Sequence, residues 1–325
     1  MEKNDIQKKA SRMRLIIWLG VIASVVIFAL RVVLLPMVRA LDTGRFSIRG
    51  LVVCLVLVFF GVLAMRVRGL RLSRVEISGR YSVWLTCGLC IAGGSMVVTC
   101  LWDLVNWWLT GNIPAPVAAE MTSLTWASLL LSLAFGVLGG VVLVWLGLRI
   151  TGEGATRAGM AAWSVLAPVL WMWFRLFRYE MSYVSVTNLS ESFYDFALFI
   201  VELLFLFQFA RYVSGVGKPN TGSLLFYAVA MAAFGISGPL VRVCTYLLDD
   251  GGLYMTGGLS GLPDLAIGVL ALVLSCALAG SVRNAKDKEE EELYQPSDMG
   301  LLFSLEDLLS SDAQRASSEE GDSQQ

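Results

Sequence analysis

Eight apolar stretches, each close to the length of a bilayer-crossing helix, dominate this sequence of 325 residues. The hydrocarbon core of a membrane needs roughly 20 residues of helix to cross it. Backbone polar groups find no water there, so only helices and closed barrels can span it. We therefore predict an all-α polytopic membrane bundle of about eight helices, at residues 15–37, 48–67, 82–109, 123–148, 159–177, 192–213, 222–248 and 262–282.

Basic residues are shared unevenly between the two sides of such a bundle. With segment 1–14 inside, 17 Lys and Arg flank the inner ends of the stretches and 5 flank the outer ends. Inner loops of membrane proteins carry the excess of Lys and Arg. The distribution therefore predicts a cytoplasmic N-terminal segment at 1–14, a transmembrane domain at 15–282 and a cytoplasmic C-terminus (N-in/C-in), in a multi-pass protein of the cell membrane.

The chain ends in an acidic segment, residues 283–325, which holds 12 acidic and 4 basic residues. Since the whole chain has 26 acids and 25 bases, residues 1–282 keep 14 acids and 21 bases. High charge and few apolar residues predict a disordered cytoplasmic tail. Leucines at helical spacing in 301–309 predict a short amphipathic helix. This helix either docks, on a cytoplasmic protein partner or on a basic loop of this protein, or forms only transiently and has no partner. These leucines are Leu301, Leu302, Leu305, Leu308 and Leu309.

The sequence contains no histidine, which removes histidine-based metal sites, catalytic triads and proton relays together. The run Gly-Leu-Ser-Gly at 258–261 matches a motif of rhomboid proteases, but that serine needs a histidine base. Tyr194-Asp195 resembles the Tyr-Asp of presenilin-type proteases, but no second aspartate faces it from the next stretch. The basic loop 66–80 is short, so we expect it to contact lipid headgroups rather than nucleic acid. We expect no enzyme, no metal site and no cofactor.

Prolines and glycines inside the stretches predict local features of the helices. Pro168 and Pro239 each lie within a stretch and should kink its helix. Gly136 and Gly140 are four residues apart, a spacing that lets a second helix approach closely. We expect that contact inside the bundle rather than at a dimer interface.

Glu202 is the most constrained of the charged residues within the apolar stretches. It lies about eleven residues into the stretch 192–213, near the bilayer midplane, where an unpaired charge costs about 2.5 kcal/mol or more. Intramembrane carboxylates face the bundle interior, and they either mark an ion or ligand site or form a structural pair. Arg175, Arg178 and Arg242 start nearer the outer surface and extend toward water. We therefore expect Glu202 to be neutral or hydrogen-bonded rather than strongly ion-paired.

The remaining charges gather in the outer half of the bundle under the predicted orientation. Glu191, Asp195 and Glu202 follow i, i+4, i+11 spacing, which puts them on one helix face. Asp264 also falls in this half, without an assigned partner. Long side chains near helix ends also reach water without serving any function. The candidate polar or ion-binding residues are Glu202, Asp195, Glu191, Arg175, Arg178, Arg242, Asp103 and Arg31.

A basic N-terminal segment, about eight apolar stretches and an acidic tail follow one another in this chain. Between the fifth and sixth stretches come the runs Phe-Arg-Leu-Phe-Arg at 174–178 and Phe-Tyr-Asp-Phe-Ala-Leu at 193–198. In this order of features the chain resembles uncharacterised multi-pass bacterial membrane proteins of unknown function. The resemblance implies no activity.

Two classes of function fit these features. The first is a binding, sensing or scaffold protein with a polar cavity in its outer half, whose partners are the lipid bilayer and a cytoplasmic protein engaged by the tail. The alternative is a secondary transporter that uses Glu202 as a proton or cation site. Discontinuous helices in paired positions would favour transport, whereas a shallow outer pocket closed toward the cytoplasm would favour binding.

Overall fold

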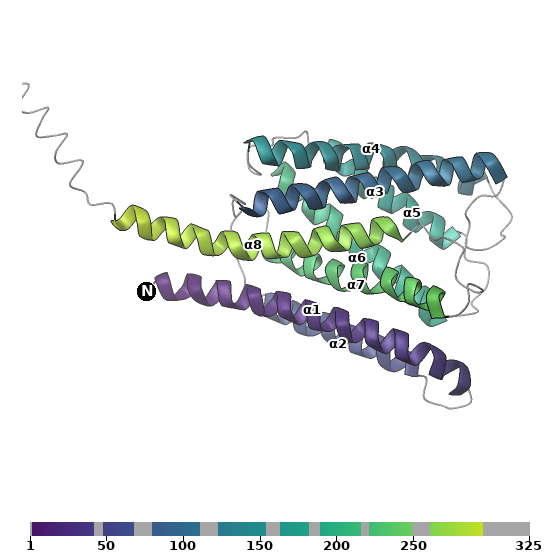
Figure 1. Ribbon diagram of the computed structural model, residues 1–325, viewed down its shortest axis with the longest axis horizontal. Helices are drawn as coiled ribbons and strands as arrows, with labels where there is room; N and C mark the ends of the chain where they lie inside the picture. The colour runs from purple at the N-terminus through teal and green to yellow at the C-terminus, as the bar shows by residue number, and fades with distance from the viewer. Residues whose placement is uncertain are drawn as a thin grey trace, which may run out of the picture. The chain divides into compact units, whose positions relative to one another are not determined.

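A computed structural model describes residues 2–41, 48–67, 80–110, 123–153, 163–181, 189–215, 221–248 and 261–294, and these residues are helical almost throughout (Figure 1). The described part contains no strand. The chain divides into two compact units, residues 1–282 and 283–325, and the helical bundle belongs to the first. The helices are α1 (Glu2–Leu41), α2 (Ile48–Val67), α3 (Arg80–Thr110), α4 (Ser123–Glu153), the 3₁₀ turn η1 (Ser164–Leu166), α5 (Ala167–Met181), α6 (Leu189–Ser214), α7 (Thr221–Leu248) and α8 (Leu262–Tyr294).

Six of these helices contain segments that are long and apolar enough to cross a membrane. They lie at Ala10–Leu30, Tyr81–Leu109, Trp126–Ile150, Tyr194–Ser214, Thr221–Val241 and Leu262–Val282. Among the described residues α2 offers only a shorter apolar segment, Val58–Val67, and α5 has 15 residues. The predicted all-helical class is confirmed, and the six apolar helices indicate a multi-pass membrane protein. The count of eight spans and their orientation stay predictions.

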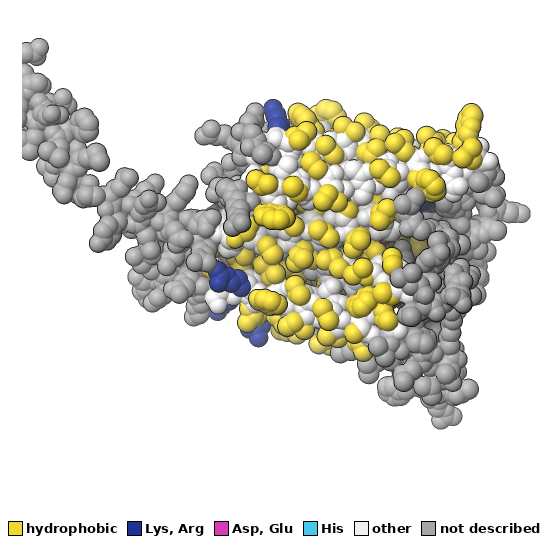
Figure 2. Space-filling model, in the orientation of Figure 1, with side chains coloured by type: hydrophobic (Ala, Val, Ile, Leu, Met, Phe, Trp, Pro, Cys, Tyr) yellow, Lys and Arg dark blue, Asp and Glu magenta, His cyan; other side chains and the backbone are white. Residues whose placement is uncertain are grey.

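The surface of the bundle is suited to hydrocarbon rather than to water. Large apolar side chains stand exposed along the helices, including Trp84, Trp108 (84% exposed) and Leu148. Figure 2 shows one face covered by hydrophobic side chains, with Lys and Arg gathered near one end of it. Soluble monomers rarely expose apolar patches of this extent, so the surface agrees with the length and hydropathy of the six segments.

Glycines allow the helices to pack at short distances inside the first unit. A Cβ atom added to Gly140 of α4 would lie 2.5 Å from the carbonyl oxygen of Gly93 in α3. A Cβ atom at Gly136 would collide with Cys100 of α3 and Trp171 of α5. The close contact expected of Gly136 and Gly140 therefore lies inside the bundle, as predicted. In the same way, Gly235 of α7 faces α8.

The fifth helix differs from its prediction in position and shape. It begins at Ala167 rather than at 159, after the turn η1, and it ends at Met181 rather than at 177. Pro168 therefore stands in its first turn, where a missing N–H breaks no helical hydrogen bond, and the predicted position of Pro168 in the middle of a helix is wrong. Pro239 does lie inside α7.

The last helix extends beyond its predicted end. The backbone of α8 stays helical to Tyr294, whereas disorder was predicted from residue 283 onward. Ala, Lys and Glu in this stretch are strong helix formers, and lengthening an existing helix requires no new nucleus. The five leucines of 301–309 lie outside the described residues.

Candidate functional site

Arg175 lies in the middle of α5, a helix packed against α4 and α6. Its side chain is only 10% exposed. The guanidinium carbon lies 5.3 Å from the ring centre of Trp171 on the same helix and 4.7 Å from that of Phe199 on α6. An aromatic face attracts a cation, more strongly where water is excluded. The two rings therefore stabilise a guanidinium at a place where it has lost most of its hydration.

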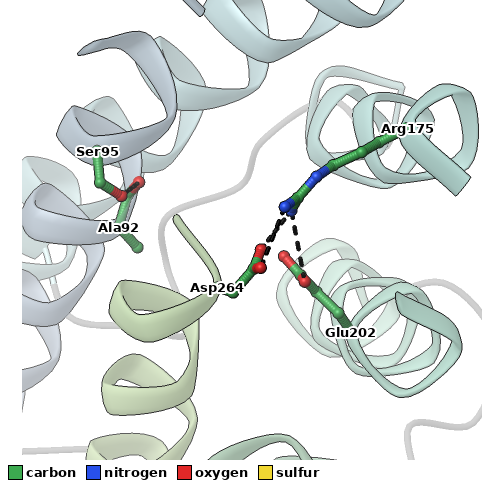
Figure 3. A network of polar contacts seen from close by, with 5 residues as sticks. All are labelled: Ala92, Ser95, Arg175, Glu202 and Asp264. Atoms are coloured by element: carbon green, nitrogen blue, oxygen red, sulfur yellow. Dashed lines mark hydrogen bonds and ion pairs between the residues drawn. The ribbon is translucent and has the colours of Figure 1, made fainter. Parts of the chain in front are cut away.

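Asp264, in the first turn of α8, is the hydrogen-bond partner of this arginine. Arg175 Nη2 donates to Asp264 Oδ2 at 3.1 Å, and Nη1 donates to Oδ1, so the contact is bidentate (Figure 3). Asp264 is fully buried. The positive end of the helix dipole at the start of α8 favours a carboxylate there. Gly235 of α7 leaves room for this turn, since a Cβ atom there would lie 2.8 Å from the Asp264 carbonyl oxygen.

Glu202 of α6 points at the same guanidinium, and its carboxyl group lies beside that of Asp264 (Figure 3). It is 0% exposed, and its Oε2 atom lies 3.9 Å from Arg175 Nη1. Neither carboxyl oxygen has a hydrogen-bond partner in the described part of the chain. The interior position agrees with the helix face predicted from its spacing. Two buried carboxyl groups thus compete for one guanidinium. Asp264 accepts two hydrogen bonds from it, whereas Glu202 accepts none in the described residues.

The sequence prediction that no arginine would extend inward to Glu202 is wrong. Arg175 does so because α5 runs from Ala167 to Met181 rather than from 159 to 177, which moves this residue from the end of the helix to its middle. The side chain is then surrounded by neighbouring helices and the Asp264 carboxylate attracts it, so the path to water is closed. The expectation that Glu202 lacks a strong ion pair agrees with its 3.9 Å separation.

Arg178 and Asp103 form a second charged group close to the first. Asp103 on α3 interacts electrostatically with Arg178 and with Arg175, both on α5. The Nη1 atom of Arg178 is buried and has no hydrogen-bond partner in the described residues. We call the group of Asp103, Arg175, Arg178, Glu202 and Asp264 the charge cluster. With every member ionised it holds three negative and two positive charges, a net charge of −1.

The remaining candidate residues, Asp195, Glu191, Arg242 and Arg31, are not members of the charge cluster. Asp195 lies half-buried on α6, as the seventh residue of the helix that begins at Leu189.

 

Asp195 is therefore part of the same helix face as Glu202 without being fully buried. The hydroxyl groups of its neighbour Tyr194 and of Ser237 on α7 share a hydrogen bond of 2.9 Å. The side chains of Glu191, Arg242 and Arg31 lie outside the described residues, although their backbones belong to α6, α7 and α1. The structure therefore brings together Glu202, Arg175, Arg178 and Asp103 from the predicted set.

Asp264 is the member of the cluster that the sequence left without a role. The signal for it was present, because an acid in the first turn of an otherwise apolar helix is costly unless it has a partner. Its partner Arg175 lies 89 residues away in the chain, so no local pattern joined the two. The described residues contain no group of three or more His, Cys, Asp or Glu side chains arranged to hold a metal ion.

Chemically, the cluster can hold or release one positive charge. The Arg175–Asp264 pair is neutral and joined by two hydrogen bonds, whereas Glu202 is an acid without a hydrogen-bond partner in the described residues. A buried carboxylate without donors is strongly destabilised in a medium of low polarity. Glu202 is therefore the position at which a proton or a cation has most effect.

Compared with models of protein families, with curated proteins and with solved structures, the chain gives no match.

Proposed function

We propose that this protein binds or senses an ion within the membrane through the charge cluster, with Glu202 as the ion-binding group. The observation that carries the proposal is the state of Glu202, which is fully buried and has no hydrogen-bond partner in the described residues. Asp264 already accepts two hydrogen bonds from the guanidinium of Arg175 and neutralises its charge. As an anion, a second buried acid makes no hydrogen bond to that pair, and its desolvation costs on the order of several kcal/mol. An ion that neutralises Glu202 removes this cost.

The course of the helices favours binding or sensing over transport. In the described ranges α3, α4, α6, α7 and α8 each run as one continuous helix. The break at η1 and α5 has no counterpart in a second helix of the described residues. Transporters built on inverted repeats place their sites at discontinuous helices in corresponding positions. A sensing role also gives the acidic C-terminal segment a function, as the part that engages a cytoplasmic partner.

A secondary transporter with Glu202 as its proton or cation site is the second candidate. Glu202 lies at the fourteenth residue of the 26-residue helix α6, which places it near mid-membrane if α6 spans the bilayer. Intramembrane carboxyl groups at this depth are typical of proton relays. This candidate requires that the site open alternately to both sides.

The proposal is tested by measuring the melting temperature of the purified full chain in detergent as a function of pH and of NaCl or KCl concentration. Binding of an ion to the folded state alone raises stability. We expect the wild type to respond to at least one of these ions and Glu202→Gln to lose the response. Glu180→Gln is the matched control, since Glu180 is an exposed acid on α5. Equal responses in all three proteins would refute the proposal.

Reconstitution separates the two candidates. Proteoliposomes that contain the wild type, with a pH-sensitive dye inside, are exposed to a pH jump and, separately, to a sodium gradient. A binding or sensing protein leaves the internal pH unchanged relative to empty liposomes. Proton flux in the wild type that disappears in Glu202→Gln would favour the transporter instead.

A further inference from the structure

We propose that Glu202 and Asp264 share one proton beside Arg175, so that the ion held by the cluster is a proton. This inference rests on the proposed function and specifies its ligand. The geometry behind it is the convergence of two carboxyl groups, from α6 and α8, on a single guanidinium from α5 (Figure 3).

Hydrogen-bonding capacity is the first argument. An ionised carboxylate has only acceptors, and no described group donates to either Glu202 oxygen. A protonated carboxyl group becomes a donor. The carboxylate of Asp264 is the acceptor at hand, because the two acids interact and each carboxylate oxygen can accept more than one hydrogen bond. One proton therefore turns the unsatisfied group into a satisfied one.

Charge is the second argument. One proton on the two acids leaves Arg175, Asp264 and Glu202 with a net charge of zero. A metal cation would need more oxygen ligands than two carboxyl groups supply. It would also sit next to the Arg175 guanidinium, whose Nη1 atom is 3.9 Å from Glu202 Oε2 and would repel it. A proton satisfies the same charge requirement without further ligands.

The neighbouring groups that act on this proton come from three helices besides α6. Arg175 from α5 and Asp264 from α8 interact directly with Glu202. Asp103 from α3 acts on Arg175, and Arg178 is the counter-charge of Asp103. When the proton leaves for water, Glu202 becomes an anion and competes with Asp264 for the guanidinium. Occupancy by the proton thus controls the contact between α5 and α8.

Infrared spectroscopy tests the inference on the full chain in detergent near neutral pH. A protonated carboxyl group has a C=O stretching band that an ionised carboxylate lacks. We expect the wild type to show this band and Glu202→Gln to lose it. Asp264→Asn should lose it too, because Glu202 then ionises to pair with Arg175. The control Glu180→Gln should keep it. A band that is missing from the wild type, or that persists in Glu202→Gln, would overturn the inference.

The outcome of the melting experiment separates this failure from a failure of the proposed function. If the infrared band is missing but NaCl or KCl stabilises the wild type through Glu202, the cluster binds a metal cation. The proposed function then stands, and the shared proton is refuted. If the band is missing and no ion acts through Glu202, both proposals fail. Glu202→Gln retains the size of the side chain, so it keeps the test usable if Asp264→Asn does not fold.

Discussion

Removing both acids that face Arg175 should cost more than the sum of the two single substitutions. Asp264→Asn takes away the bidentate partner of Arg175. Glu202 can then replace it, because its Oε2 atom is already 3.9 Å from Nη1 and needs only a small shift. Glu202→Gln leaves the Arg175–Asp264 pair intact and removes an acid without donors in the described residues. In the double variant the guanidinium keeps neither acid.

The magnitudes follow from the burial of the three groups. We expect Glu202→Gln to cost about 0.5 kcal/mol or less, and Asp264→Asn about 2 kcal/mol, the scale of a lost charged hydrogen bond. The double variant should cost about 4 kcal/mol, because breaking a buried pair leaves an uncompensated charge. The coupling energy is then about 1.5 kcal/mol, within the range found for residues in contact.

The assay is the unfolding of the purified protein in mixed micelles, followed by helical circular dichroism as a denaturing detergent replaces a mild one. Wild type, both single variants and the double variant form the cycle, and Glu180→Gln reports the effect of removing an exposed acid. Additive costs, with a coupling energy near zero, would show that Glu202 does not substitute for Asp264 at Arg175. The reasoning about competition for one guanidinium would then be refuted.

Three further predictions concern the packing and the topology. Gly235→Ala should destabilise the protein by about 1–3 kcal/mol, because its Cβ atom would press on the backbone of α8. The control Gly94→Ala should not destabilise it, because a Cβ atom there meets nothing within 4 Å. Equal losses of stability in denaturation of the two variants would contradict this prediction. A single cysteine at position 115 should react with an impermeant thiol reagent from outside and one at position 72 should not, if the Lys and Arg bias sets the orientation; the reverse labelling would contradict it. Truncation after Asn284 should leave yield and melting temperature nearly unchanged, since the acidic segment buries few apolar groups; a large loss of either would show that the segment supports the bundle.

The long apolar helices could be predicted from the sequence within a few residues. The structure has α3 at Arg80–Thr110 and α7 at Thr221–Leu248, where 82–109 and 222–248 were predicted. Hydropathy succeeds here because each membrane-spanning segment must form its backbone hydrogen bonds within its own helix and present apolar side chains to the lipid. The glycine contacts inside the bundle were also predictable, because Gly136 and Gly140 lie four residues apart on one helix face, where small residues let another helix approach closely.

The fifth helix and the charge cluster could not be predicted in the same way. Hydropathy ended the fifth stretch too early, because Arg175, Arg178 and Glu180 lower the apolar average in the part where the helix continues. Arg175 is buried only because Asp264, from a distant part of the chain, and two aromatic rings compensate it. Such compensation depends on the tertiary structure, and the sequence of one helix does not contain it.

The three charges at the centre of the cluster differ in how they are compensated, and this difference identifies the variable member. Arg175 has two aromatic faces and two hydrogen bonds to one carboxylate. Asp264 has the guanidinium and the positive end of α8. Glu202 has a guanidinium at 3.9 Å and no hydrogen-bond partner in the described residues. A change of charge at Arg175 or Asp264 would break their own hydrogen bonds, whereas Glu202 has no hydrogen bond in the described residues that a change of its charge would break. Glu202 is therefore the residue at which an ion can come and go while the helices around it stay folded.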